Sequence, residues 1–393
     1  MKKNKKAWAQ YLLAGMLTFF GGKAKADSTS HSAPATPSSI TATSTQTNLP
    51  AKPNFACEIY SYAINPEVAR AQGRLLFDRT KHLLKLNEDL KLQCYRDNVD
   101  KATLGLGCNI QDFSQILKDL NIPLIWRDDA KHSHACLGAE RDDICARLAK
   151  MSKAELARIS ILPQHVEPLA RETYAYFYER VSNIFAQPDI QWVSKNGKTT
   201  ATTNILTGID FASTPYYLQA AVMDTFYQLG ETKFTKQYHL LNTAIREGKY
   251  AEAFAQLAVN RTDKTTQKYK DEGSARRAFR KDVLGWAHTI AKDHPKYTAN
   301  DFVTKLASDI DIKVSPKKYN GVINQIEKNA AFRCTIPFIV DQFYSDLSPK
   351  QQAQKKVDLM AKWNAAQKNL REVKAKQAVA LAAQKKKAAT ASK

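Results

Sequence analysis

Beyond its first 26 residues, the chain lacks long apolar runs and the short motifs that mark common metal and nucleic-acid sites. No later stretch is long and apolar enough to cross a bilayer, so we expect a soluble mature protein without stable membrane insertion. The sequence has no Cys-x-x-Cys pair, no zinc-finger spacing and no aromatic RNA-binding motif. We therefore expect no nucleic-acid partner.

The chain also has few acidic residues for its many basic ones. Lys and Arg number 59 against 38 Asp and Glu, which gives a formal net charge of +21. Such a charge attracts anionic partners such as cell wall, lipid head groups or nucleic acid, but it specifies no reaction. The chemistry must therefore come from individual motifs.

Residues 1–26 have the three parts of a secretory signal. Four lysines precede a mostly apolar run, Ala7–Phe20, and Ala24-Lys25-Ala26 then provides small residues where a signal peptidase cuts. An uncleaved membrane anchor is the alternative, but the run is short for a bilayer span and contains a glutamine and a glycine. We expect cleavage and a periplasmic or secreted protein.

The rest of the chain divides by composition. Residues 27–53 are rich in Ser, Thr, Ala and Pro with almost no large apolar side chain, which predicts a disordered linker. Residues 54–290 are long enough for one good-sized core, and residues 291–348 predict a helical extension. Residues 349–393 form a basic low-complexity tail that we expect to be solvated. This tail either binds an anionic wall polymer or only keeps the protein in solution.

Six cysteines fit an exported protein, because an even count in an oxidising compartment favours disulfides. Cys136 and Cys145 are close enough in sequence to close a loop, and Cys57 with Cys334 could tie the extension to the mature N-terminus. The His-x-His-x-Cys run of residues 132–136 could bind a metal. We favour a disulfide-closed surface loop there and predict no metal site.

Residues 65–88 predict a helix that ends in an acidic residue. Asn65-Pro66-Glu67 begins it with a capping side chain, a proline and an acid in the first turn. Apolar residues at helical spacing continue to Leu86, although Gly73 leaves two shorter helices as an alternative. Glu88 then falls at or just after the last turn.

A hairpin is predicted directly after this helix. Residues 90–95 alternate apolar and polar as a half-buried strand does, residues 97–100 supply a turn, and residues 102–104 return as a second strand. The helix end and the hairpin can thus place Glu88 and Asp97 across a cleft. Two carboxyl groups on opposite sides of a sugar–sugar bond are what glycoside hydrolysis requires.

The spacing of these residues is similar to a family signature. Glu88, eight further residues, Asp97, five more and Thr103 follow one another, and Gly105 and Gly107 complete a Gly-x-Gly pair. This order resembles the phage-type lysozymes, glycoside hydrolase family 24. The resemblance implies that Glu88 is the general acid, that Asp97 is the base that activates water, and that Thr103 holds this water.

The resemblance also implies an inverting reaction, for which carboxyl separations of roughly 6.5–9.5 Å are expected. One carboxyl group must keep its proton for the leaving group, and partial burial favours that form. The other must be ionised to direct water. No cofactor or metal is needed.

Residues 214–232 extend the resemblance to a second lobe. They predict a helix that is apolar nearly all round, and they resemble the central helix of the family. By position, five residues are implied to contact the glycan: Asn109, Tyr227, Gln228, Gln237 and Gln256. Helix surface is the alternative for Gln228 and Gln256. Arg276 is implied to hold Glu88 in position through its charge.

The match departs from the family pattern at three places. Cys108 stands where the best-known members have a histidine that supports the fold, and a disulfide to Cys94 would replace that support. The spacing from Gly273 to Arg276 is one residue shorter than usual, and Arg280 replaces an acid. The altered spacing and Arg280 weaken the assignment of a role to Arg276 more than the assignment of Glu88.

Residues from about 110 to 213 form an insertion relative to simple family members. The aromatic residues at 174–178 in its long predicted helix are more typical of a core than of a sugar platform. Asn196-Gly197 predicts a tight hairpin, which either overhangs the cleft or only packs on the surface.

Together these features predict a mostly helical α+β protein. Its expected architecture is a two-lobed lysozyme-like fold with a small β-hairpin sheet, an inserted subdomain and a helical C-terminal extension. The expected function is that of an exported muramidase, which cleaves the β-1,4 bond between N-acetylmuramic acid and N-acetylglucosamine in the glycan strands of peptidoglycan. The alternatives are a peptidoglycan-binding protein without turnover and a membrane-active protein that works through its basic tail.

Overall fold

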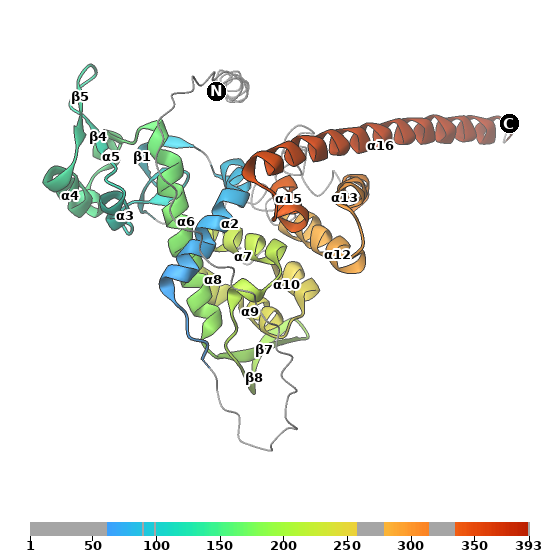
Figure 1. Cartoon of the computed structure of the whole chain (residues 1–393), viewed down its shortest axis with the longest axis horizontal. Coiled ribbons are helices and arrows are strands. Elements are labelled where there is room, and N and C mark those ends of the chain that lie inside the picture. The colour runs from blue at the N-terminus through green and yellow to red at the C-terminus, as the bar shows by residue number, and fades with distance from the viewer. Residues whose placement is uncertain (1–60, 89, 98–99, 258–278, 314–334, 392–393) are drawn as a thin grey trace, which may run out of the picture. The chain divides into compact units, whose positions relative to one another are not determined.

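The computed structural model describes residues 61–88, 90–97, 100–257, 279–313 and 335–391. These residues are mostly helical with a small antiparallel sheet, which confirms the predicted α+β class (Figure 1). The expected signal and linker, together with Cys57, Arg276 and Cys334, lie outside the described residues. Within the described ranges, no helix is both long and apolar enough to span a bilayer.

Helices account for most of the described chain. They are α2 (Pro66–Asn87), α3 (Ser114–Asp119), α4 (Gly138–Arg147), α5 (Lys153–Leu156), α6 (Pro163–Ala186), α7 (Tyr216–Leu229), α8 (Glu231–Gln237), α9 (His239–Arg246), α10 (Tyr250–Leu257), α12 (Gly285–Asp293), α13 (Ala299–Lys313), α15 (Ile336–Tyr344) and α16 (Pro349–Ala391). Short helical segments add η1 (Leu148–Lys150), η2 (Phe211–Ser213) and the π-helical η3 (Phe279–Leu284). The strands are β1 (Lys91–Arg96), β2 (Ala102–Gly105), β3 (Cys108–Asn109), β4 (Leu124–Arg127), β5 (Ser133–Cys136), β6 (Ile159–Ser160), β7 (Asp189–Lys195) and β8 (Lys198–Leu206).

Six of the strands form one antiparallel sheet in the order β3-β2-β1-β6-β4-β5. The expected hairpin is present, with Tyr95 of β1 opposite Thr103 of β2 and Thr103 opposite Asn109 of β3. The insertion supplies β4, β5 and β6, and it joins the hairpin where Gln93 pairs with Ser160. The insertion therefore extends the sheet that carries the candidate acids.

Helix α2 begins as the sequence predicts and runs as one helix. The side chain of Asn65 accepts hydrogen bonds from the backbone N–H groups of Glu67 and Val68 at 3.0 and 3.3 Å. Gly73 does not divide the helix. A Cβ atom at this position would lie 2.7 Å from the Cβ of Tyr178 in α6, so the glycine lets the two helices pack closely.

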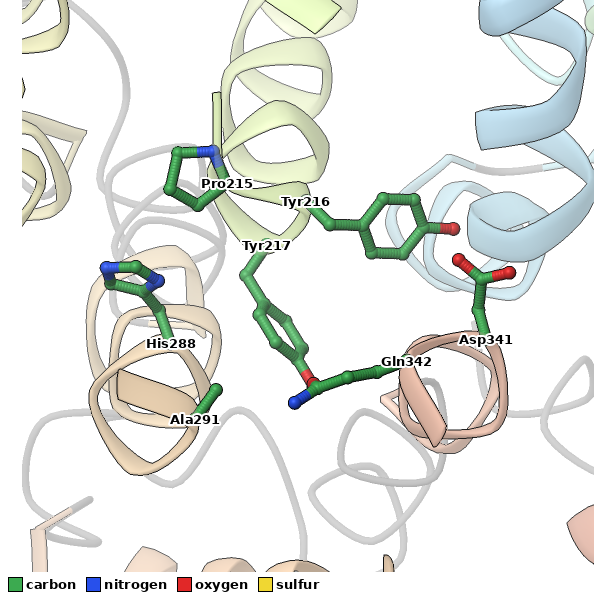
Figure 2. A pocket seen from close by; sticks show the side chains of 7 residues that line it. All are labelled: Pro215, Tyr216, Tyr217, His288, Ala291, Asp341 and Gln342. Atoms are coloured by element: carbon green, nitrogen blue, oxygen red, sulfur yellow. The ribbon is translucent and has the colours of Figure 1, made fainter. Parts of the chain in front are cut away.

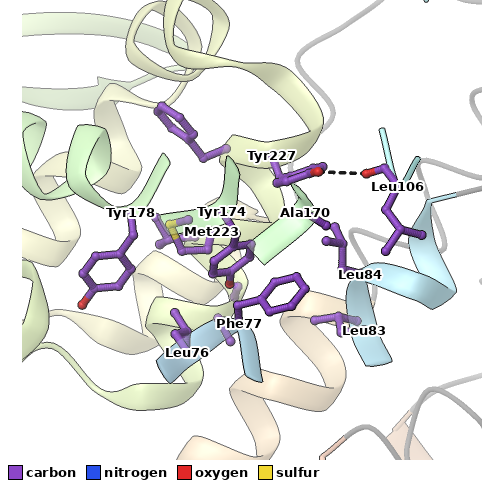
Figure 3. Close-up of a cluster of buried hydrophobic side chains, with 14 of the residues drawn as sticks. Leu76, Phe77, Leu83, Leu84, Leu106, Ala170, Tyr174, Tyr178, Met223 and Tyr227 are labelled. Atoms are coloured by element: carbon purple, nitrogen blue, oxygen red, sulfur yellow. Dashed lines mark hydrogen bonds between the residues drawn. The ribbon is translucent and has the colours of Figure 1, made fainter. Parts of the chain in front are cut away.

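The core lies where α2, α6 and α7 meet (Figure 3). Tyr174 and Tyr178 of α6 are 3% and 1% exposed, and Phe177 packs edge-on against Phe226 and Tyr227 of α7 at centroid distances of 5.4 and 5.3 Å. The prediction that this aromatic set belongs to the core is confirmed for Tyr174, Phe177 and Tyr178, whereas the half-buried ring of Tyr176 lies beneath the guanidinium groups of Arg70 and Arg180. Helix α7 is buried along nearly its whole length, as predicted for the central helix.

The C-terminal segment differs from the solvated tail that the sequence predicts. Helix α16 packs its first part on α13 and α15, where Leu359 and Trp363 are each 1% exposed and the side chain of Gln367 donates to the carbonyl of Ala307. Residues 371–384 of the same helix are exposed. Two large apolar side chains four residues apart lie on one helix face, and this pair is enough to dock an otherwise polar segment.

Candidate functional site

Glu88 lies where α2 ends. Its backbone N–H donates to the carbonyl of Leu84 at 2.8 Å, and its own backbone is extended, so the helix stops at this residue. The carboxylate lies over Gly107 in the turn between β2 and β3. A Cβ atom at Gly107 would be 3.1 Å from Oε2 of Glu88 and 3.5 Å from the ring of Tyr227, and the φ of Gly107 is +76°. A glycine is therefore required both by the backbone and by the approach of the carboxylate.

Asp97 lies at the end of β1 in a tight loop. The hydroxyl of Thr103 donates to Oδ2 of Asp97 at 3.2 Å, and the backbone N–H of Lys101 donates to Oδ1 at 2.9 Å. The backbone N–H of Asp97 in turn donates to the carbonyl of Lys101 at 3.0 Å. Thr103 is only 2% exposed. The loop thus fixes the carboxylate of Asp97 beside the predicted threonine.

The two acidic groups contact the chain at different positions, one within strand β2 and one in the turn that follows it. Thr103, which contacts Asp97, and Gly105 are two residues apart on this strand, hence on one face and roughly 7 Å apart. Gly107, which contacts Glu88, follows in the turn to β3. The structure therefore groups Asp97 with Thr103, and it groups Glu88 with Gly107 near the opposite end of β2.

Tyr227 connects the central helix to this turn. Its hydroxyl donates to the carbonyl of Leu106 at 2.8 Å and lies 3.4 Å from Sγ of Cys108 (Figure 3). Tyr227 is 9% exposed and Cys108 is 1% exposed. Burial raises the pKa of the Cys108 thiol, so this thiol stays protonated. The cysteine that replaces the family histidine thus packs against Tyr227 close to Glu88.

The two disulfides predicted within the described residues are wrong, because all four of these cysteines are free thiols. Cys94 lies on β1 and Cys108 on β3, and β2 runs between them. Two strand spacings amount to roughly 9.6 Å, which is beyond the reach of a disulfide. Cys136 ends β5, whereas Cys145 lies in the third turn of α4. Cys145 lies roughly 10 Å along the helix axis from the first residue of α4, so it is also too far from Cys136 for a disulfide.

The residues implied to contact glycan have different surroundings. The side-chain oxygen of Asn109 accepts from the backbone N–H groups of Gln111 and Asp112, each at 3.1 Å, so it stabilises the turn after β3. Gln237 has a buried Oε1 without a hydrogen-bond partner. Gln256 is partly buried on α10. The contacts of the Asn109 side-chain oxygen are thus structural.

Gln228 is exposed, but its side chain contacts a buried ion pair that the sequence did not predict. Arg280 on η3 is fully buried, and its Nε lies 2.5 Å from Oδ2 of Asp224 on α7. Its Nη2 donates to the side chain of Gln228 at 2.7 Å. The available signal was Asp224 itself, because an acid inside an almost wholly apolar helix requires a cation nearby. Arg280, noted only as a departure from the family pattern, provides it.

The β7–β8 hairpin has the tight turn that Asn196-Gly197 predicts, with φ values of +50° and +73°. The hairpin packs on α9, where the ring of Trp192 lies 4.7 Å from that of His239. Residues 193–201 at its tip are exposed. The contact between Trp192 and His239 thus supports the alternative that the hairpin packs on the surface.

A cavity of about 280 Å³ lies away from the predicted acids, between α7, α12 and α15 (Figure 2). Its lining residues are Pro215, Tyr216, Tyr217, His288, Ala291, Asp341 and Gln342. Asp341 forms an ion pair with Arg79, yet burial raises the pKa of its carboxyl group. None of the residues predicted as a site lines this cavity.

Comparisons of the chain with family models, with curated proteins and with solved structures find no match.

Proposed function

We propose that the protein is an exported muramidase with a lysozyme-like fold, which hydrolyses the β-1,4 bond between N-acetylmuramic acid and N-acetylglucosamine in peptidoglycan. The observation that carries the proposal is that Asp97 accepts a hydrogen bond from Thr103 within β2, while Glu88 lies against Gly107 in the turn directly after this strand. The sequence spacing of these residues supports it independently. The basic net charge of +21 supports an anionic wall as the partner.

The proposed reaction gives the two acidic groups different roles. Glu88 protonates the glycosidic oxygen as the bond breaks, while Asp97 accepts a proton from a water molecule that attacks the opposite face of the sugar. Inverting hydrolysis needs carboxyl groups roughly 6.5–9.5 Å apart so that a water fits between base and sugar. Asp97 contacts Thr103 within β2, whereas Glu88 contacts Gly107 in the turn after this strand, so the two groups meet the chain at separate positions, as such a gap requires.

Contacts already made by each acid support the assigned roles. Asp97 accepts hydrogen bonds from a backbone N–H and from the Thr103 hydroxyl, and these hold its carboxyl group in one orientation, as a base that directs water requires. Glu88 is half-buried beside Gly107 and the ring of Tyr227, so part of its side chain stays open to a substrate, as a general acid requires.

The test is release of reducing ends from purified peptidoglycan by the mature protein. Glu88→Gln and Asp97→Asn should each lower turnover by about 10²- to 10⁴-fold, the usual contribution of a general acid or base. Asp100→Asn is the matched control, because Asp100 lies in the same hairpin with an 88% exposed side chain and should keep full turnover. Turnover by Glu88→Gln equal to that of the wild type would refute the assigned role of Glu88.

One observation favours the alternative of a peptidoglycan-binding protein without turnover. Thr103 is 2% exposed and its hydroxyl already donates to Asp97 or Lys101, which leaves it poorly placed to hold a water. Sedimentation with insoluble peptidoglycan, without fragments detectable by mass spectrometry from several wall types, would support this alternative.

A further inference from the structure

A second group of chemically active side chains lies in the insertion, on β5 and at the start of α4. His134 and Cys136 are two residues apart on β5, so their side chains leave the same face of the strand. The chain then turns at Gly138, whose φ is +53°, and the first turn of α4 brings Glu140 back toward them. Within the described residues, this is the one group of three or more His, Cys, Asp and Glu side chains close enough to hold a metal ion.

The spacing of the donor atoms fits a tetrahedral metal ion. One ligand atom from each of His134, Cys136 and Glu140 can be chosen so that all three lie within 4.8 Å of one another. Ligand atoms around tetrahedral zinc lie about 3.5 Å apart, given bond lengths of about 2.0–2.3 Å. Small side-chain rotations would therefore complete the site.

A further carboxylate already orients the histidine. Nδ1 of His134 lies 2.8 Å from Oδ2 of Asp128, and its Nε2 lies 2.8 Å from Oε1 of Glu140. Histidine ligands of metals usually give their second ring N–H to a carboxylate, which fixes the tautomer and ring orientation. Asp128 occupies that position, so Nε2 faces the other two donors.

We propose that His134, Cys136 and Glu140 bind a divalent transition-metal ion of the zinc type, with Asp128 orienting the histidine. A thiolate with an imidazole selects such ions over Mg²⁺ and Ca²⁺, which prefer oxygen ligands. Cys136 gives up its thiol proton to solvent as the metal binds. The side chain of His134 is 45% exposed, so an ion can reach the site from solvent. Cys136 is buried and would bind the ion from the protein side.

The bound ion would fix strand β5 to α4. The three ligands come from both sides of the Gly138 turn, and the β4–β5 hairpin is otherwise joined to the sheet through the pairing of β4 with β6. Trp126 of β4 lies directly opposite His134, so its fluorescence reports the site.

The experiment titrates the chelator-treated mature protein with Zn²⁺ by calorimetry and with Co²⁺ by absorbance. The wild type should bind one equivalent at this site and show a thiolate-to-cobalt charge-transfer band. His134→Gln and Cys136→Ser should abolish the band, and Asp128→Asn should weaken binding by about 10- to 100-fold. Because His134 is half-exposed, its substitution tests the site even if Cys136→Ser fails to fold.

His132→Gln is the matched control. His132 lies on the same hairpin, pairs with Asp129 and has a 73% exposed side chain, so this variant should bind metal as the wild type does. Absence of the charge-transfer band in the wild type would overturn the proposal, and so would equal losses in the His132 and His134 variants. These readouts measure binding, so their outcome is independent of peptidoglycan cleavage.

Discussion

Replacing Arg280 should cost more stability than replacing any surface cation of this protein. The Arg280–Asp224 pair is almost fully withdrawn from solvent, with side-chain exposures of 1% and 3%. Arg280→Met keeps most of the side-chain volume but removes the positive charge. The carboxylate of Asp224 would then stay buried on the central helix and lose its ion pair with the guanidinium group of Arg280.

The expected loss can be worked from these contacts. Removing one partner of a buried ion pair costs about 3–5 kcal/mol, because the remaining charge stays buried and loses the opposite charge closest to it. The hydrogen bond from Arg280 to Gln228 adds little, since Gln228 is exposed and water can replace its partner. A loss of about 4 kcal/mol lowers the ratio of folded to unfolded protein roughly a thousandfold.

Urea titration followed by circular dichroism measures this loss. The double variant Asp224→Leu with Arg280→Met should recover much of the lost stability, because it also removes the buried negative charge of Asp224. Arg171→Met is the matched control. Its partner is Asp78 and both side chains are more than a third exposed, so the cost should stay below about 1 kcal/mol. A loss below about 1 kcal/mol for Arg280→Met, or a double variant no better than the sum of the single ones, would refute the reasoning.

Two more predictions concern the contact between α2 and α6. Gly73→Ala should destabilise the protein by about 1–3 kcal/mol despite the better helix propensity of alanine, because the new methyl group would meet Tyr178 at 2.7 Å; a raised urea midpoint would contradict this. Burial opposes ionisation of Glu167, but hydrogen bonds from Lys81 and Lys85 outweigh it and lower the pKa of Glu167 to about 2. Since this pKa lies below the unfolded value of about 4.3, the stability it contributes is present above that pH and lost as the pH falls. The stability difference between wild type and Glu167→Gln should therefore shrink from about pH 5 to about pH 2, and a constant difference would show that the ion pairs contribute nothing.

Local signals in the sequence predicted the elements that carry the site. Asn65 and Pro66 fixed the start of α2, and the turn residues after Arg96 fixed the hairpin, because both depend only on neighbouring backbone groups. The apolar composition of α7 likewise predicted its burial. Gly73 was ambiguous for a physical reason. Its role depends on α6, which follows about a hundred residues later.

Local sequence signals could not predict the cysteine pairing or the packing of the C-terminal segment. Proximity in sequence suggested Cys94 with Cys108, but strand order decides the distance and β2 lies between them. The composition of residues 349–393 did not predict the burial of Leu359 and Trp363, because this burial depends on the helices against which they pack. Such contacts are tertiary, so neither periodicity nor charge over a short window predicts them.

The turn between β2 and β3 is where the core and the candidate acids meet. Tyr227 comes from the buried central helix, and its hydroxyl binds the backbone of this turn at Leu106. Glu88 comes from the end of α2 and lies against Gly107 in the same turn. A shift of α7 relative to α2 would therefore move the turn beneath the Glu88 carboxylate, while the Asp97–Thr103 hydrogen bond, which lies within the hairpin, would persist. The separation of the two acids thus depends on the packing of the core, whereas the geometry at Asp97 depends on the hairpin alone.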